Sequence, residues 1–296
     1  MKATNLAIWS LVALLAAGFT ACEKDDIEIA EPHMTLTMNE GVGSIKLDIY
    51  AKSEDQNDVW IDLNNNGIQE NGEKVILFHN VDTYFFSSKT VSIYGKVTEL
   101  DCSFNQLIAL DVSKNTALIR LECYFNRLTA LDVSKNTALI SLDCYFNKLK
   151  ALDISKNSAL TWLNCSCNQL TKLNLSKNTN LSVLDCSINH LTELNVSKNT
   201  ELEILKCFNN QLTELNVSKN TVLQHLYCYN NSIYDSKMDA LVNSLPDRTA
   251  STEGSFRVIN NGYDEGNICT PAQVYIAKNK NWNVMDSEGN TYTGSK

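Results

Sequence analysis

Apolar residues recur along the middle of the chain with a period of 21 residues, from residue 97 to residue 231. Each period follows the pattern L-x-x-L-x-C-x-x-N, and the first six copies continue with three further apolar positions and Ser-Lys-Asn. The seven copies begin at Val97, Leu118, Leu139, Leu160, Leu181, Leu202 and Leu223. Because alternate residues of a strand face opposite sides, the second Leu and the Cys of each copy should point inward. Such self-similarity predicts a solenoid in which each copy forms one coil and packs on its neighbours.

A cysteine fills the third apolar position of every copy. The seven residues are Cys102, Cys123, Cys144, Cys165, Cys186, Cys207 and Cys228. Equivalent side chains on stacked coils point the same way, which is poor geometry for disulfides, and a line of sulfurs does not converge as zinc ligands must. Free cysteine is among the most buried residue types. We therefore predict seven buried thiols, with Cys167 outside the ladder and more exposed.

The return part of each copy is short. The segment 128–138, LTALDVSKNTA, has 11 residues, too few for a helix with its turns. We expect extended or 3₁₀-like return segments and hence only gentle curvature, because wide helices on the outer side are what bends such arrays strongly. The repeating inward Asn, as in Asn126, can satisfy backbone groups where the chain leaves the sheet. The turns should depend on Asn, Asp and Ser, since no Gly or Pro lies between Gly95 and Pro246.

Both flanks of the array have a different pattern. Residues 36–96 alternate apolar and polar side chains, as in SIKLDIYAK, and predict a small β cap over the first coil. After Asn231 the period ends, and residues 235–245 show helical spacing with Ser236 and Asp239 as a capping box. A strand at FRVIN, a helix opening at Thr270-Pro271 and a strand at NWNVMD complete a predicted α/β cap.

The N-terminal cap contains the segment DLNNNGIQENGE, which matches the twelve-residue calcium loop D-x-N-x-N-G-x-x-x-x-x-E. Its oxygen donors would come from the following residues: Asp62, Asn64, Asn66, Ile68 through its carbonyl, Glu70 through water and Glu73 in bidentate fashion. Gly67 permits the sharp turn. The flanks predict strands rather than paired helices, so the expectation is a structural calcium site on a β domain. An Asn-rich turn without metal is the alternative.

The first 22 residues, MKATNLAIWSLVALLAAGFTAC, combine one positive charge, an apolar run and small residues, as a secretory signal does. The apolar run is too short for a spanning helix. The net charge of −9 becomes −10 without residues 1–21, because Lys2 is the only charge lost. An acidic chain with no basic run is a poor nucleic-acid binder, since phosphate neutralisation requires cations.

The repeat unit resembles the leucine-rich repeat, and its length and cysteine are similar to the cysteine-ladder class of internalins. That resemblance implies a right-handed superhelix with a parallel β-sheet, capped at both ends. Phe19-Thr20-Ala21-Cys22 resembles a bacterial lipobox with Phe in place of the usual Leu, which implies lipidation of Cys22. The following Glu23-Lys24-Asp25-Asp26 is similar to the export signal of Bacteroidetes-type surface lipoproteins. The alternative is ordinary cleavage after Ala21.

These patterns divide the chain into five parts. They are a signal peptide (1–21), a flexible tether (22–35), a β-rich cap (36–96), seven repeats (97–231) and an α/β cap (232–296). Two or three acyl chains on Cys22 would anchor the protein stably in the outer membrane. The surface-lipoprotein resemblance implies that it faces the cell exterior.

The outward side chains of the predicted sheet vary from copy to copy and mix aromatic with charged residues, a composition typical of recognition surfaces. The predicted ligand contacts are Arg120, Glu122, Tyr124, Asp143, Tyr145, Trp162, Lys206, Phe208, Tyr227 and Tyr229. Phe104, Phe125 and Phe146 form a further column that favours a stabilising aromatic ladder.

No nucleophile, base and orienting group can be assembled from the histidines, so a catalytic role is not expected. Two hypotheses remain. The chain is either a lipid-anchored, adhesin-like binding protein for a host or envelope protein, less plausibly for a glycan, or a scaffold of a cell-envelope complex.

Overall fold

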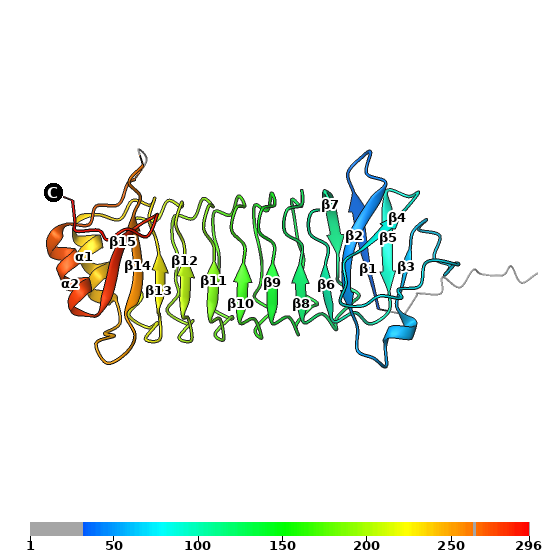
Figure 1. Ribbon diagram of the computed structural model, residues 1–296, viewed down its shortest axis with the longest axis horizontal. Coiled ribbons are helices and arrows are strands. Elements are labelled where there is room, and N and C mark those ends of the chain that lie inside the picture. The colour runs from blue at the N-terminus through cyan, green and yellow to red at the C-terminus, as the bar shows by residue number, and fades with distance from the viewer. Residues whose placement is uncertain (1–31, 263–264, 296) are drawn as a thin grey trace, which may run out of the picture. The chain divides into compact units, whose positions relative to one another are not determined.

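The computed structural model describes residues 32–262 and 265–295, which belong to one compact unit, Pro32–Lys296 (Figure 1). The predicted signal peptide, Cys22 and most of the predicted tether lie outside the described residues. The tether was predicted to extend to residue 35, but strand β1 begins at His33. Met34, which the tether prediction assigned to solvent, is fully buried because its strand pairs with residues of the cap.

An eleven-stranded sheet runs the length of this unit (Figure 1). Its strands, in spatial order, are β15 (Trp282–Asp286), β14 (Gly254–Ile259), β13 (His225–Tyr227), β12 (Ile204–Lys206), β11 (Val183–Asp185), β10 (Trp162–Asn164), β9 (Ser141–Asp143), β8 (Arg120–Glu122), β6 (Glu99–Asp101), β2 (Ser44–Tyr50) and β4 (Asp82–Phe85). The strands from β6 to β15 pair in parallel, whereas β2 and β4 are antiparallel to their neighbours. Each repeat supplies one three-residue strand, and equivalent positions of adjacent repeats are in register.

The core of the array is a stack of identical layers. In each coil the middle residue of the strand, such as Leu142, is buried, and its two neighbours are partly or, for Arg120, largely exposed. All seven ladder cysteines are fully buried and free of disulfides, as the sequence predicts. Cys167 is partly exposed, which also agrees with the prediction. The fold is a leucine-rich-repeat solenoid.

Asparagine side chains join each coil to the next. The amide nitrogen of Asn126 donates to the carbonyl oxygens of Cys102 and Cys123, each at 3.0 Å. Its Oδ1 atom accepts from the backbone N–H of Leu107 at 2.9 Å. Asn126 also bonds to the backbone of Asn105 and Tyr124, so this inward Asn satisfies five backbone groups where the chain leaves the sheet.

A second asparagine ladder lies on the opposite side of each coil. It comprises Asn115, Asn136, Asn157, Asn178, Asn199 and Asn220, all essentially buried. The amide nitrogen of Asn136 donates to the carbonyl oxygens of Val112 and Asn115, at 3.0 and 2.8 Å. The sequence analysis assigned the repeated Ser-Lys-Asn to turns, and the structure adds that its Asn also connects successive coils.

The return segments contain no helix between residues 97 and 231, all of which are described. The first return segment is exceptional because it forms β7 (Leu107–Asp111), which pairs with the N-terminal cap. One residue in every coil, two positions after the ladder cysteine, has a left-handed backbone with φ between 50° and 59°. This series consists of Phe104, Phe125, Phe146, Cys167, Ile188, Asn209 and Asn230.

The N-terminal cap consists of two sheets. A four-stranded sheet has the order β3 (Trp60–Asp62), β5 (Thr90–Tyr94), β1 (His33–Met38) and β7. The second layer is formed by β2 and β4, which continue the long sheet of the repeats. A short 3₁₀ turn, η1 (Gln56–Asp58), precedes β3. Because β2 pairs with β6, the first repeat strand is not left as an open edge.

The C-terminal cap adds α1 (Asp235–Ser244) and α2 (Pro271–Asn279) beside β14 and β15 (Figure 1). Thr270 and Gln273 form a capping box at α2. The capping box predicted at Ser236 and Asp239 is wrong, because α1 has Tyr234 at its N-cap and no side-chain cap. Asp239 instead accepts a hydrogen bond from Gln273 at 2.7 Å, which joins the two helices. Among the described residues, no helix has the length and apolar character needed to cross a bilayer.

Candidate binding face

The outward side chains of the long sheet form three columns that run across the strands. The first column precedes the buried Leu of each strand, as Arg120 does, and the second follows it, as Glu122 does. The third column lies just after the ladder cysteine, as Tyr124 does. Strand register places Glu122 beside Asp143 and Arg120 beside Ser141. The columns therefore align the outward side chains of successive repeats on one continuous face.

The second column is acidic toward the N-terminal cap. Its members, from β2 to β14, are Asp48, Asp101, Glu122, Asp143, Asn164, Asp185, Lys206, Tyr227 and Arg257. Partial burial and neighbouring carboxylates raise the pKa of Glu122. Burial raises the pKa of Asp143 to about 6, although the backbone N–H of Tyr145 and the amide of Asn164 lower it. These carboxylates are therefore crowded and partly desolvated.

The turns of the return segments contain the same side-chain-to-backbone hydrogen bond as the sheet face, but the pKa of the aspartate shifts in the opposite direction. Asp132 Oδ1 accepts from the backbone N–H of Ser134 at 2.8 Å, just as Asp143 Oδ1 accepts from Tyr145 at 3.0 Å. On the exposed turn, however, the hydrogen bonds from Ser134 lower the pKa of Asp132. The local turn is similar in both places, so burial and neighbouring charge on the sheet face explain the opposite shift.

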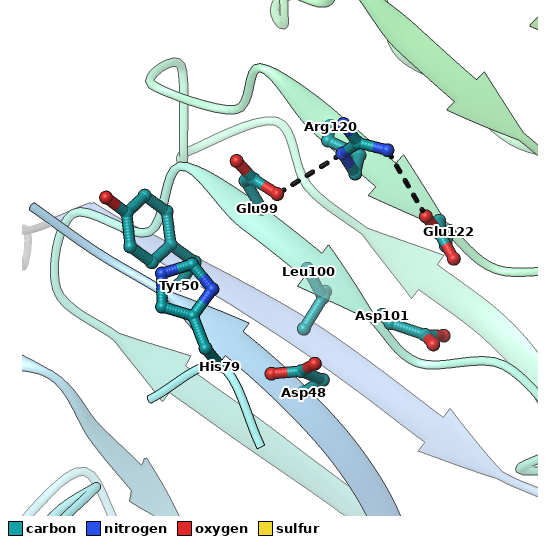
Figure 2. Close-up of a pocket in the computed structure, with 8 residues that line it drawn as sticks. All are labelled: Asp48, Tyr50, His79, Glu99, Leu100, Asp101, Arg120 and Glu122. Atoms are coloured by element: carbon teal, nitrogen blue, oxygen red, sulfur yellow. Dashed lines mark ion pairs between the residues drawn. The ribbon is translucent and has the colours of Figure 1, made fainter. Parts of the chain in front are cut away.

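A pocket of about 200 Å³ lies where the N-terminal cap meets the first two repeats. Figure 2 shows Arg120 between Glu99 and Glu122, with nitrogen–oxygen distances of 3.2 and 3.7 Å. His79 packs against Tyr50 with ring centroids 3.8 Å apart (Figure 2). The remaining walls are Asp48, Leu100 and Asp101. The pocket thus joins two predicted contacts, Arg120 and Glu122, to cap residues that the sequence analysis did not assign to the site.

The cap residues were missed for a definite reason. Alternation in SIKLDIY places Asp48 and Tyr50 on the side of the strand opposite Leu47, which could be predicted from the sequence. That this side continues the outward face of the repeats depends on the antiparallel pairing of Asp48 with Asp101. No local pattern specifies that pairing.

An aromatic cluster lies beside the acidic part of the second column. Phe104, Phe125 and Phe146 stack with centroid distances of 4.6 and 4.5 Å, which confirms the predicted ladder. Tyr124 and Tyr145 contact these rings edge-on, Tyr145 to Phe125 at 5.0 Å. Phe104 and Phe146 are nevertheless 64% and 50% exposed. The ladder therefore also forms an exposed aromatic surface.

A separate group of predicted contacts lies near the C-terminal cap. Phe208 and Tyr229 stack at 4.5 Å, and Lys206 pairs with Asp185 at 3.5 Å. The guanidinium of Arg257 lies over the ring of Tyr227 at 4.8 Å. Trp162 is on β10, between this group and the aromatic cluster. The structure thus places the predicted contacts on one face but divides them into two groups.

The predicted calcium loop begins at the last residue of β3. Asp62 is fully buried and Glu73 is 4% exposed. The two Asp62 oxygens accept from the backbone N–H groups of Asn66 and Gly67, at 3.0 and 2.7 Å. The two Glu73 oxygens accept from the backbone N–H groups of Leu63 and Glu70, at 2.9 and 2.8 Å. Both carboxylates are held at the loop, and each oxygen keeps a second lone pair.

In the middle of the loop, asparagine side-chain amides form hydrogen bonds with a carboxylate of the same loop. The side-chain nitrogens of Asn64 and Asn66 donate to the Glu70 carboxylate, at 2.9 and 3.2 Å. Ile68 donates its N–H to Asn66 and has an exposed side chain. Among the described residues, no three His, Cys, Asp or Glu side chains converge closely enough to hold a metal ion. A calcium site here would draw on Asn and carbonyl oxygens as well, so calcium stays a prediction.

Comparison with known proteins gives structural similarity only. No family model matches the sequence, and no curated protein matches it. The functional domain of InlJ from Listeria monocytogenes, described as including a cysteine ladder, is 31% identical, with 55% of this chain and 50% of that one covered and a TM-score of 0.34. A leucine-rich-repeat protein of Leptospira interrogans, LIC12759, is 27% identical over 59% of this chain and 44% of that one, with a TM-score of 0.48.

YopM, a leucine-rich effector protein from Yersinia pestis, is 30% identical over 58% of this chain and 43% of that one, with a TM-score of 0.43. The chain therefore covers half or less of the length of these three proteins. Because these TM-scores are below 0.5, the assignment to the leucine-rich-repeat fold rests on the sheet and its repeating core.

Proposed function

We propose that the protein is a lipid-anchored, non-enzymatic receptor at the cell surface that binds another protein on the outward face of its sheet. The observation that supports this function is the exposed aromatic cluster beside charged side chains on a rigid parallel sheet. Aromatic anchors contribute most of the binding energy at many protein interfaces. A rigid sheet loses little conformational entropy when a partner covers it.

Adhesion to a host or envelope protein is the specific form of this proposal. Lipidation of Cys22 would place the receptor at the outer surface of the outer membrane, with the tether separating it from the bilayer. Replacing Cys22 with Ser should release the protein from the membrane fraction. If the variant stays with membranes after a carbonate wash, the anchor lies elsewhere.

The test of binding uses residues 32–296 and a pair of matched double variants. Tyr145→Ala with Trp162→Ala removes two aromatic side chains from the face, and Lys135→Ala with Lys156→Ala changes two exposed residues of the return turns. Proteins captured from host-cell and parent-envelope extracts are compared by quantitative mass spectrometry. We expect a captured protein that is lost with the first variant and retained with the second, at nearly unchanged melting temperatures.

The same experiment separates the receptor from a scaffold. A scaffold of an envelope complex would capture envelope proteins that are lost with the return-turn variant or with cap substitutions. If capture is unaffected by the Tyr145 and Trp162 changes, the sheet face is a solvated surface and the receptor hypothesis is wrong.

A further inference from the structure

The acidic part of the second column carries an electrostatic cost that the chain itself offsets only in part. Asp48, Asp101, Glu122 and Asp143 occupy adjacent positions on four consecutive strands. Like charges directly opposite each other on neighbouring strands destabilise a sheet. The spacing between these strands is roughly 4.8 Å, so each carboxylate has a like-charged neighbour close by.

Few cations offset this row. Arg120 pairs with Glu99 and Glu122, and on the other side of Asn164 the carboxylate of Asp185 pairs with Lys206. Asp101 and Asp143 each use one oxygen to accept a backbone N–H two residues ahead, at 2.8 and 3.0 Å. That turn motif explains an Asp or Asn at these positions. It does not explain charged residues, because Asn164 makes the same turn bond to Ser166, at 3.2 Å.

The aromatic cluster beside this row carries a second cost. Phe104, Phe125 and Phe146 have φ values of 59°, 50° and 54°, a left-handed conformation that disfavours large side chains. Asn209 and Asn230 hold the equivalent position in later repeats, where Asn is a common left-handed residue. These strained positions hold phenylalanine rings beside carboxylates that are only partly neutralised, and a partner would bury the exposed apolar surface and neutralise the charge.

We propose that the face from β2 to β10 binds a lysine- and arginine-rich segment of a partner protein, with its cationic groups along the carboxylate row and its apolar stems over the aromatic cluster. The proposal rests on the proposed receptor function and names the chemistry of its partner. Cations separated by one to two strand spacings, roughly 5 to 10 Å, would match the row. The pocket beside Tyr50 and His79 would receive the cationic side chain nearest the cap.

Charge complementarity favours such a segment over a neutral glycan. Hydroxyl groups of a sugar can hydrogen-bond to carboxylates but do not neutralise them, whereas ammonium and guanidinium groups do both. Cations are also attracted to aromatic rings, and Tyr124, Tyr145 and the phenylalanine stack lie beside the carboxylate row.

The experiment uses residues 32–296 and a defined probe. The probe is a twelve-residue peptide in which six lysines alternate with serines and tyrosines, and its control is the same peptide with all lysines acetylated. Asp101→Asn with Asp143→Asn removes two charges from the row and keeps the turn acceptors. The matched control, Asp132→Asn with Asp153→Asn, removes two charges from equivalent turns on the return side.

We expect the sheet-face variant to lose at least tenfold in affinity for the lysine peptide, and the return-side variant less than twofold. Affinity should fall as salt increases, and the acetylated peptide should not bind measurably. The sheet-face variant should melt at the same temperature as the parent or higher, because a repulsion has been relieved.

Several results would overturn the proposal. These are equal losses in both variants, no measurable binding of the lysine peptide, equal binding of the acetylated peptide, or glycan binding that needs Tyr145 but not the carboxylates. Failure of the cationic-partner proposal can be distinguished from failure of the proposed receptor function. If the sheet-face variant still captures the protein that Tyr145→Ala with Trp162→Ala loses, the receptor stands and only the cationic partner is wrong.

Discussion

At the scale of single residues, cysteine is used in this protein as a small apolar side chain. Each ladder thiol lies in a fully buried layer, and burial is the main cause that raises the pKa of Cys144 well above its ordinary value. The thiolate, which is the reactive form, is correspondingly disfavoured. Cys144 also lies within 3.6 Å of the carbonyl oxygen of Asn164, so the thiol is a weak donor to the neighbouring coil.

Replacing Cys144 with Ser should lower the free energy of unfolding by about 1–3 kcal/mol, because a polar hydroxyl group would be buried and its shorter C–O bond would hold it farther from the carbonyl oxygen of Asn164 than the thiol is. Urea unfolding measures the loss. Cys167→Ser is the matched control, and its partly exposed position predicts a change within about 0.5 kcal/mol. Equal losses in the two variants would show that burial does not determine how much these thiols contribute to the free energy of unfolding. In the native parent, a thiol reagent should modify Cys167 before any ladder cysteine.

At the scale of the repeat element, the predictable and unpredictable features have different physical origins. Period 21 with alternating apolar residues specified the strands, the inward Leu and Cys, and the absence of helices in the return segments. The cap boundaries were less predictable because they depend on pairing between distant segments. Residue 33 pairs with Tyr94, and β7 leaves the repeat pattern to pair with β1.

The candidate site could likewise be predicted only in part from the sequence. The three outward columns follow from strand periodicity, so the ten predicted contacts do lie on one face. Asp48, Tyr50 and His79 could not be added, because their position beside Glu99 and Asp101 comes from the junction of cap and repeats. The left-handed turn in every coil was also unpredictable, since Phe104 and Ile188 are not residues that usually adopt it.

Ile188 tests the cost of that turn. Its φ is 53° and its side chain is 42% exposed, so a β-branched residue is held in an unfavourable conformation with little packing in return. Ile188→Asn should therefore raise the free energy of unfolding by about 1 kcal/mol. The reverse exchange in the next repeat, Asn209→Ile, should lower it by at least as much, because Asn209 also accepts from Asn230. Urea unfolding curves that move both variants in the same direction would contradict the interpretation.

The cap loop at residues 62–73 carries the calcium prediction. Calcium should bind the parent with measurable heat and raise its melting temperature, because a ligand that binds only the folded state stabilises it. Glu73→Ala should abolish both effects, since Glu73 would be the bidentate ligand. Glu70→Ala, which changes a carboxylate that would act only through water, should weaken binding less. No heat with the parent would leave an Asn-rich turn held by its own hydrogen bonds.

At the scale of the whole described unit, stability should be close to a sum over coils and their interfaces. Each coil bonds to its neighbours through strand pairing and two asparagine ladders, and the caps cover the two ends of the array. The Leu, Cys and Asn positions of the core recur from coil to coil, with exchanges among aliphatic residues such as Val133, Ile154 and Leu175. One coil should therefore be removable if the two that become neighbours keep their register.

Deleting residues 160–180 should leave a cooperatively folded protein. The deletion removes β10 and joins Ala159 to Leu181, so Leu181 takes the place of Leu160 and β11 can pair directly with β9. Urea unfolding should remain a single transition with a slightly smaller m value, because less surface is buried. Deleting residues 160–179 is the matched control. Its extra residue shifts the following chain by one position, which exchanges inward and outward side chains on a strand. We expect that variant to unfold at a much lower urea concentration or to aggregate. If both deletions fold equally well, register does not control the array, and the stacked layers of Leu, Cys and Asn are not what holds its coils together.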